Sequence, residues 1–264
     1  MDLQLKGKTA LVTGSTAGIG LAIAARLAAE GAAVTLAGRE AAKLDTAVAH
    51  VLGAAPGARV DAVVADAGSA EGAAALVAAK PDVDILVNNL GYYEGRAFED
   101  IPDADWTRML DVNVLSGVRL ARHHFPRMLA RDWGRILFIS SEAGIATPGD
   151  MIHYGVSKSA QLAVARGLAE RTKGTKVTVN SVLPGPTRSA GIVEFFRSTA
   201  PRPGMTDAEI EANFFDQYRP SSLLRRLIEA DEVAAMVALL ASPLGAATNG
   251  AAVRVEGGIV QSIT

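Results

Sequence analysis

Short apolar runs alternate with longer amphipathic stretches along the chain, and this alternation predicts strands that alternate with helices. The first unit is a buried strand over 9–12, a glycine-rich turn over 14–20 and a helix over 19–30, whose apolar residues Ile19, Ile23 and Leu27 share one face. The further predicted strands are 33–37, 59–65, 85–88, 135–140, 176–182 and 251–255, and the further predicted helices are 40–52, 69–79, 103–129, 153–171 and 231–240.

Strands that alternate with helices favour a parallel sheet covered by helices on both faces. The seven predicted strands therefore indicate an α/β fold with a doubly wound parallel sheet. No linker rich in proline or serine interrupts the alternation, and no repeat with a period of about 20 to 50 residues is visible. We therefore expect residues 1–264 to form a single domain.

The segment 189–220 breaks this alternation, and we expect it to form a lid over a ligand site. It contains Pro201, Pro203 and Gly204. It also holds five of the eleven phenylalanine and tyrosine residues of the chain, namely Phe195, Phe196, Phe214, Phe215 and Tyr218. Loops of this length in a compact domain tend to be functional. The alternative is that these aromatic side chains form a satellite cluster of the core.

Composition and charge exclude several classes of protein. Of the 264 residues, 49% are hydrophobic and 20% are charged, as in an ordinary globular domain. The 26 basic and 28 acidic side chains leave a net charge of −2, which supplies no general attraction to nucleic acid or to an anionic membrane surface. No stretch approaches the ~20 apolar residues of a membrane helix, and no signal peptide is visible. We expect a cytoplasmic protein.

Metal chemistry has little support in the sequence. The absence of cysteine excludes disulfides, thiolate nucleophiles and cysteine-ligated metals. His123 and His124 are adjacent in a predicted helix, so their side chains point about 100° apart and make a poor metal pair. We therefore expect no metal site.

The glycine-rich turn after the first strand is typical of a site for a dinucleotide cofactor. Free backbone N–H groups and the positive end of the helix dipole meet there, and glycine lets a phosphate approach the backbone closely. A glycine turn can also serve packing alone, but its place in the first β-α unit of a doubly wound sheet favours cofactor binding. The candidate cofactor-binding residues are Gly14, Ser15, Thr16, Gly18, Ile19 and Gly20.

The end of the second strand indicates which cofactor binds. A carboxylate there would accept hydrogen bonds from a free ribose 2′-OH, whereas an arginine would suit a 2′-phosphate. Gly38 stands where the acid is expected and Arg39 follows it, so charge complementarity favours NADP over NAD. Glu40 leaves an alternative open, in which Glu40 contacts the ribose and Arg39 is solvated.

Tyr154 and Lys158 lie four residues apart in a predicted helix, so their side chains leave the same face. An ammonium about 4 Å from a phenol stabilises the phenolate and would lower the pKa of the tyrosine. Such a tyrosine can exchange a proton with an oxygen when hydride moves at the adjacent carbon. Ser140 and Ser141 close the preceding strand, at the edge where open α/β sheets bind ligands. Taken alone, the pair could be an exposed face with the ring on the lysine stem.

In combination these motifs resemble the short-chain dehydrogenase/reductase family, over residues 6–258. The family's motifs match residues 13–20, residues 88–91, Asn113, Ser141, Tyr154 with Lys158, and Pro184 with Gly185. Ser141 lies thirteen residues before Tyr154, as in the family. The sequence departs from the family at Leu90, where alanine is more frequent, and at Glu256, where aspartate is more usual in what we expect to be a structural turn.

The resemblance implies a Rossmann-like fold and a role for each matching residue. Tyr154 would be the general acid/base, Lys158 would hold the nicotinamide ribose and depress the pKa of the tyrosine, and Ser141 would hydrogen-bond the substrate oxygen. Asn113 would position a water that relays protons to Lys158. The further cofactor contacts implied are Asp66 near the adenine, Asn89 near the adenosine ribose and Thr187 near the carboxamide or pyrophosphate, with Gly91, Pro184 and Gly185 at the same site. Asp66 could instead cap the helix that starts near Ser69, and Thr187 could simply follow a proline turn.

The sequence therefore predicts an oxidoreductase that favours NADP(H), interconverts a ketone and a secondary alcohol, and is most similar to the 3-oxoacyl carrier-protein reductases of the family. An acyl thioester is a candidate substrate. Substrate contacts are expected from Tyr92, Tyr93 and Glu94, from residues 142–150 and from the lid. The apolar circumference of 155–170 indicates a homodimer or homotetramer. The alternative function is a nucleotide-sensing regulator that uses the same fold without catalysis.

Overall fold

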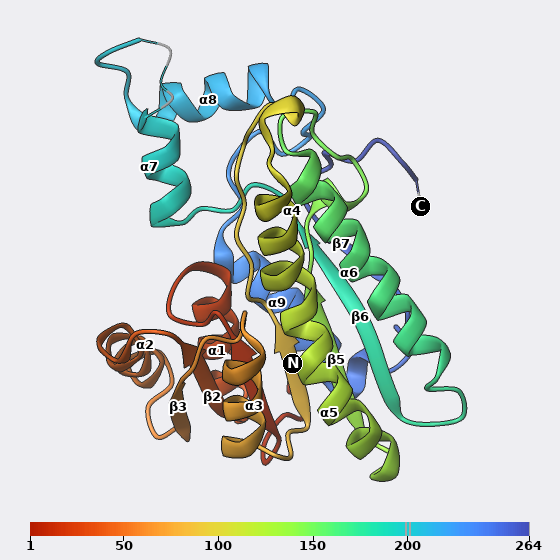
Figure 1. Ribbon diagram of the computed structural model, residues 1–264. Coiled ribbons are helices and arrows are strands. Elements are labelled where there is room, and N and C mark those ends of the chain that lie inside the picture. The colour runs from red at the N-terminus through yellow and green to blue at the C-terminus, as the bar shows by residue number, and fades with distance from the viewer. Residues whose placement is uncertain (199, 201, 264) are drawn as a thin grey trace.

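Seven strands form one parallel sheet in the computed structural model, which describes residues 1–198, 200 and 202–263 (Figure 1). The strands are β1 (Thr9–Thr13), β2 (Ala33–Gly38), β3 (Val60–Val64), β4 (Ile85–Asn88), β5 (Gly134–Ile139), β6 (Val177–Pro184) and β7 (Ala252–Val255). Their order across the sheet is β3-β2-β1-β4-β5-β6-β7, and every neighbouring pair is parallel. The predicted doubly wound sheet is confirmed.

The direction of the strand order reverses between β1 and β4. From β1 the chain first builds outward to β3, and it then returns to place β4 on the other side of β1. Open α/β sheets bind ligands in the crevice beyond the carboxyl ends of the strands at such a reversal. The glycine-rich turn follows β1 and the segment 89–91 follows β4, so both lie at this crevice.

Helices cover both faces of the sheet (Figure 1). One face packs against α1 (Gly18–Ala29), α2 (Ala41–Ala54) and α9 (Ala230–Ala241), and the other against α3 (Ala70–Ala79), α5 (Ser116–Ala130) and α6 (Ile152–Glu170). Successive strand residues point to opposite faces, so Ala10 and Val12 of β1 join the first core cluster while Leu11 joins the second. This two-sided burial explains why the strands read as continuous apolar runs.

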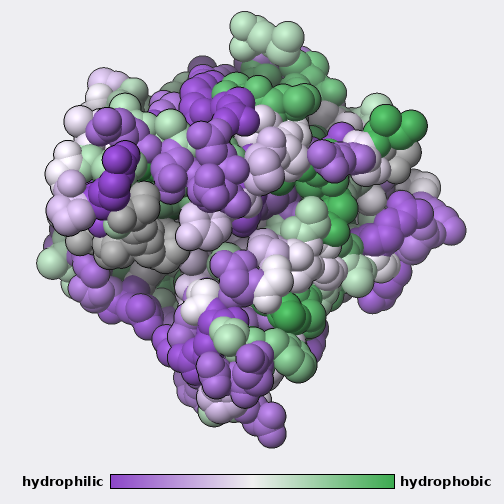
Figure 2. Space-filling view, turned by 90° about the horizontal axis from the view of Figure 1, so that it is seen from above, coloured by the Kyte–Doolittle hydropathy of each residue, from purple (hydrophilic) through white to green (hydrophobic). Residues whose placement is uncertain are grey.

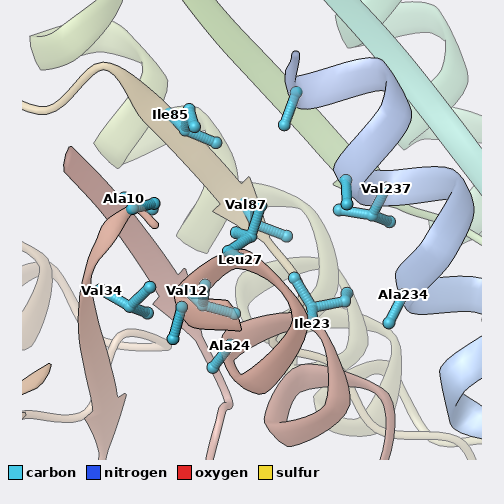
Figure 3. Packing of buried hydrophobic residues seen from close by; sticks show 14 of the residues in the cluster. Ala10, Val12, Ile23, Ala24, Leu27, Val34, Ile85, Val87, Ala234 and Val237 are labelled. Carbon is cyan, nitrogen blue, oxygen red and sulfur yellow. The ribbon is translucent and has the colours of Figure 1, made fainter. Parts of the chain in front are cut away.

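Figure 3 shows the first of these two clusters, in which α1 and α9 lie side by side against the same face of the sheet. Ile23 and Leu27 of α1 pack against Val87 of β4 and are fully buried. Ala24 of α1 lies on the side of Val12 and Val34, and Ala234 of α9 faces Ile23, so small side chains of the same cluster let α1 pack closely on both neighbours. The glycine turn thus leads into a helix, α1, that is packed against both the sheet and α9.

The predicted helix over 103–129 contains a change of helical geometry. The chain forms α4 (Asp103–Leu110), a π-helical turn (Asp111–Leu115) and then α5 without leaving the helical path. Such π turns occur often at functional sites, because the extra residue per turn re-aims the side chains around it. Here the π turn carries Asn113, whose side chain is buried.

The expected lid contains helices α7 (Ala190–Ser198) and α8 (Asp207–Gln217). The start of α8 has a capping box, in which Thr206 and Glu209 bond each other's backbone N–H groups. Phe196 and Phe215 belong to a small apolar cluster of their own, as the satellite-core alternative expected. Pro201 and the side chain of Phe195 lie outside the described residues.

The lid cluster also contributes to the ligand site. Phe196 and Phe214 both line the cavity at the carboxyl ends of the strands. Figure 2 views the molecule from this side, where polar side chains cover much of the surface and apolar ones gather in separate patches. Within the part of the chain that the structure describes, no helix is both long and apolar enough to cross a membrane.

Candidate active site

A cavity of about 670 Å³ lies at the carboxyl ends of the central strands. The predicted site residues that line it are Gly14, Gly18, Ile19, Gly20, Asn89, Gly91, Ser141, Tyr154, Lys158, Pro184, Gly185 and Thr187. The expected substrate residues Tyr92, Tyr93 and Glu94 line it as well. Ser15, Thr16, Arg39, Asp66 and Asn113 were also predicted at the site but are not part of the cavity wall.

The glycine turn takes a shape that side chains would obstruct. Gly14 and Gly18 have φ angles of 61° and 55°, in the left-handed region that favours glycine. A Cβ on Gly20 would collide with the Nδ2 of Asn89 and the carbonyl oxygen of Gly14. The same Nδ2 donates to the carbonyl oxygens of Thr13 (2.9 Å) and Gly14 (3.0 Å). Asn89 therefore stabilises the turn through its Nδ2. Its Oδ1 stays available to accept a hydrogen bond from a ribose hydroxyl.

Ser15 is committed to the fold. Its buried Oγ donates to the carbonyl oxygen of Val12 (2.8 Å) and accepts from the backbone N–H of Ala37 (2.9 Å). These two hydrogen bonds of the Ser15 hydroxyl tie β1 to β2. The neighbouring Thr16 places its methyl group against Gly38 at the end of β2. The side chains of both residues thus shape the turn from behind.

The amino end of α1 presents free hydrogen-bond donors to the cavity. Its N-cap residue, Ala17, has no side chain that could cap the helix. Among the described residues, nothing accepts a hydrogen bond from the backbone N–H of Gly18 or Ile19. These donors and the helix dipole suit a phosphate group, and the absence of a Cβ on the flanking glycines leaves room for it. The residues present therefore fit the pyrophosphate of a dinucleotide.

The residues after β2 differ in their partners. Glu40 accepts a hydrogen bond from the Nζ of Lys43 at 2.7 Å. Arg39 is exposed and pairs with none of the described carboxylates. A guanidinium is therefore available beside Gly38, which favours the interpretation with Arg39 over the alternative with Glu40.

Ser141, Tyr154 and Lys158 converge on the cavity from two elements. Ser141 follows β5, and Tyr154 lies in the first turn of α6, one helical turn before Lys158. The Nζ of Lys158 donates to the carbonyl oxygen of Ile139 (2.9 Å), and the Oγ of Ser140 donates to the carbonyl oxygen of Lys158 (2.9 Å). These two bonds hold α6 against the end of β5. The Nζ of Lys158 lies 5.6 Å from the centre of the Tyr154 ring.

Asn113 supports the cavity from behind. Its Nδ2 donates to the carbonyl oxygen of Tyr92 (3.0 Å) and to the Oγ of Ser157 (2.9 Å), and its Oδ1 accepts from the N–H of Tyr92 (2.9 Å). Its own carbonyl oxygen accepts from the Nε2 of Gln161 at 2.5 Å. The side chain thus fixes the wall beside Gly91, and the proton relay through Asn113 stays a prediction.

The remaining predicted residues have structural partners. The Oδ1 of Asp66 accepts from the N–H of Gly68 (3.0 Å), while the cap of α3 is Ser69. The Oγ1 of Thr187 donates to the carbonyl oxygen of Gly185 (2.9 Å), so Thr187 both closes the turn after β6 and lines the cavity. Glu256 accepts from two backbone N–H groups that follow it, which makes it the turn-forming residue that the sequence suggested.

The family model for the short chain dehydrogenases matches residues 8–200. The chain belongs to the short-chain dehydrogenase family. The sequence resemblance rested on the glycine turn, the Asn-Asn-x-Gly segment and the set of Ser141, Tyr154 and Lys158. The structure gathers most of these residues at one cavity.

Individual oxidoreductases match the chain over nearly its whole length. The uncharacterized oxidoreductase YvaG of Bacillus subtilis (strain 168) is 46% identical over 263 residues, which covers 100% of both chains. The 3-oxoacyl-(acyl-carrier-protein) reductase FabG of Aquifex aeolicus (strain VF5) is 30% identical over 263 residues, with 98% of this chain and 100% of the relative covered. The crystal structure of L-sorbose reductase from Gluconobacter frateurii, complexed with NADPH and L-sorbose, superposes with a TM-score of 0.93 at 28% identity and covers 100% of both chains.

This short-chain dehydrogenase is an NAD(P)-dependent oxidoreductase that acts on CH–OH groups. The enzymatic interpretation is therefore confirmed, and the alternative of a regulator without catalysis is not needed.

The predicted substrate-contact segments 142–150 and 189–220 each contribute a charged group to the cavity wall, and the sequence does not indicate that the two groups meet. Glu142 follows Ser141 directly, is 5% exposed, and accepts a hydrogen bond from the Oγ of Ser141 at 2.5 Å. Arg219, just after α8, places its Nε 3.5 Å from the Oε1 of Glu142. The two residues are far apart in sequence, so no local pattern indicates that they meet.

The pKa of the Tyr154 phenol differs from the expectation that Lys158 would lower it. Burial raises the pKa of this phenol, the Glu142 carboxylate raises it further, and hydrogen bonding to the Ser141 hydroxyl opposes the shift only in part. Burial also lowers the pKa of the Lys158 ammonium to about 8, against the opposite effect of Glu142. The expectation was wrong for the free enzyme, because it weighed the ammonium but neither the burial of both groups nor the neighbouring carboxylate.

The buried ammonium predicts a pH-dependent stability. The pKa of Lys158 is about 8 in the folded short-chain dehydrogenase and 10.5 in its reference state, so the unfolded chain binds more protons between these pH values. The contribution of Lys158 to the free energy of unfolding therefore rises with pH across this window. We expect the stability of Lys158→Met relative to the native chain to fall by about 2 kcal/mol between pH 7 and pH 10.

Urea unfolding followed by circular dichroism at several pH values measures this difference. The exposed Lys173 serves as the control, since Lys173→Met should keep a constant difference from the native chain across the same range. A difference for Lys158→Met that does not change with pH would contradict the stated cost of burying the ammonium.

Proposed function

We propose that the chain interconverts a ketone and a secondary alcohol with NADP(H), and that Tyr154 exchanges the proton. The observation that carries this proposal is the convergence of Ser141, Tyr154 and Lys158 on one cavity that also receives the open amino end of α1. A nicotinamide bound there would supply or accept the hydride. The rest of the chemistry belongs to the side chains of the cavity wall.

Tyr154 is suited to act as the acid in reduction. As the carbonyl carbon gains a hydride, its oxygen gains negative charge and needs a proton. The raised pKa of Tyr154 keeps the phenol protonated at neutral pH, so a proton is available at its Oη. The Oγ of Ser141 lies on the same side of the cavity and would hold the substrate oxygen by turning its single O–H from Glu142 to that oxygen. Lys158 would hold ribose hydroxyls with the N–H bonds that Ile139 does not use.

Removal of the phenolic hydroxyl tests this role. We expect Tyr154→Phe to lower kcat for ketone reduction by about 10²- to 10⁴-fold, the usual contribution of a positioned general acid. The dissociation constant of NADPH should change less than about threefold, because the ring remains. Loss of NADPH absorbance with a panel of ketones measures the first quantity, and NADPH fluorescence titration the second. Unchanged turnover would remove Tyr154 from the mechanism.

The preference for NADP(H) over NAD(H) rests on Arg39. Its guanidinium is exposed and unpaired among the described residues, it stands one residue after the end of β2, and Glu40 beside it is engaged by Lys43. An arginine at this place suits the 2′-phosphate of the adenosine ribose. The complex of the related L-sorbose reductase with NADPH supports the same preference.

We expect the native chain to bind NADPH at least about 10-fold more tightly than NADH, in line with a charge-assisted hydrogen bond. Arg39→Gln should remove most of this preference by weakening NADPH binding, with NADH binding nearly unchanged. Arg59 precedes β3 at the amino ends of the strands, whereas Arg39 follows the carboxyl end of β2, so Arg59→Gln is the matched control and should leave both affinities intact. Equal dissociation constants for the two nucleotides in the native chain would contradict the proposal.

Three finer assignments complete the proposal. The similarity to FabG supports a 3-oxoacyl thioester as substrate. A groove between α5 and α6, lined in part by Phe125, Val164 and Leu168, supports pairing of two copies into a homodimer or homotetramer. The expected cytoplasmic location stays a prediction.

A further inference from the structure

The carboxylate of Glu142 occupies an unusual place for a buried charge. It lies in the wall of the cavity beside the proposed acid Tyr154, and its influence reaches the pKa values of both Tyr154 and Lys158. Its Oε2 accepts the proton of the Ser141 hydroxyl at 2.5 Å. The group that Glu142 contacts in a bound substrate must therefore lie next to the oxygen that Ser141 would hold.

Glu142 and Arg219 do not complete each other's hydrogen bonds. The 3.5 Å between Oε1 of Glu142 and Nε of Arg219 is an ion pair but too long for a good hydrogen bond. The Nη1 of Arg219 donates to the carbonyl oxygen of Tyr218 (2.8 Å), and among the described residues nothing accepts a hydrogen bond from its Nη2. Buried charges need partners for their remaining donors and acceptors. The pair thus offers one acceptor and one donor to a ligand in the cavity.

The charges around the pair select the chemistry of that ligand. An apolar chain would bury both groups and leave them unsatisfied, which is costly. An ammonium group finds no excess of negative charge, because Arg219 and Lys158 already stand beside the carboxylate. An anionic group could pair with Arg219, but it has no hydrogen to donate to Glu142 and would stand charge to charge against that carboxylate. A hydroxyl fits, since it can donate to the carboxylate and accept from the guanidinium at the same time.

We propose that Glu142 and Arg219 select substrates that carry a hydroxyl on the carbon next to the reacting carbonyl. The substrate class is thereby α-hydroxy ketones and the matching vicinal diols, including polyhydroxylated chains. This class takes precedence over the 3-oxoacyl thioester that the similarity to FabG supports, because such a thioester carries no hydroxyl next to the reacting carbonyl. Glu142 accepts the hydrogen bond from this hydroxyl, and Arg219, held beside it by the end of α8, donates to its oxygen. This inference rests on the proposed reduction of ketones at Tyr154.

Two ketones of equal size test the pair. 1-Hydroxybutan-2-one and pentan-3-one differ only in a hydroxyl in place of a methyl group on the carbon next to the carbonyl. The ratio of their kcat/KM values isolates the contact with the hydroxyl, because a change in Ser141 placement or in the pKa of Tyr154 acts on both ketones alike. We expect Glu142→Leu to lower this ratio by about 10- to 100-fold, the range for hydrogen bonds to charged groups.

Two further variants and one control separate the hydrogen bond to the hydroxyl from other effects of the substitutions. Glu142→Gln retains an acceptor oxygen and the shape of the side chain, so it should restore part of the ratio that Glu142→Leu loses. Arg219→Met should lower the ratio as well. Asp216→Asn, near the end of α8 and half exposed, is the control and should match the native chain for both ketones. NADPH binding and circular dichroism establish that each variant is folded.

The outcomes separate this inference from the function on which it rests. A ratio that Glu142→Leu and Glu142→Gln leave at its native value overturns the role of Glu142. A native chain that reduces both ketones with equal efficiency, or that prefers acetoacetyl-coenzyme A to the hydroxyketone, overturns the substrate class but leaves ketone reduction standing. Failure to oxidise NADPH with any of these three carbonyl compounds contradicts the proposed function and this inference together.

Discussion

The hydrogen bond from the ammonium of Lys158 to the carbonyl oxygen of Ile139 ties helix α6 to the end of strand β5. The bond from the Ser140 hydroxyl to the carbonyl oxygen of Lys158 closes the same junction from the other side. Together they fix the first turn of α6, and with it the Tyr154 ring, over the crevice where the strand order reverses. Ser141 follows directly in the chain, so the hydroxyl and the phenol can meet only because this junction is rigid. Burying a charge there costs stability, which is a common feature of sites built for function.

Much of this arrangement could be predicted from local patterns. The strands are apolar on both faces and the helices have one apolar side, so their alternation predicts the sheet. Tyr154 and Lys158 share a helix face because of their spacing alone. The π turn at Asn113 could not be predicted, since its extra residue leaves the helical pattern of 103–129 intact. The two lid helices were missed because the prolines and the glycine of the segment obscured them, although Thr206 and Glu209 form a readable capping box.

The charges of the site were harder to predict, because they depend on residues that the fold brings together from afar. The sequence shows an ammonium four residues from a phenol, but it does not show that both are buried or that a carboxylate stands beside them. Glu142 and Arg219 both lie in segments that the sequence predicts to contact substrate, 142–150 and the lid, but no local pattern indicates that these two side chains meet. Because Arg219 pairs with Glu142, the lid contributes a charged group to the cavity wall that would contact the substrate.

The most direct test of the whole account is a crystal structure of the native chain with NADPH and a ketone that it reduces. The account predicts that the nicotinamide ring enters the cavity, that Lys158 bonds the adjoining ribose, and that the ketone oxygen lies within about 3 Å of the Tyr154 Oη and of the Ser141 Oγ. A nicotinamide ring outside the cavity, or a ketone oxygen beyond reach of the phenol, would contradict it.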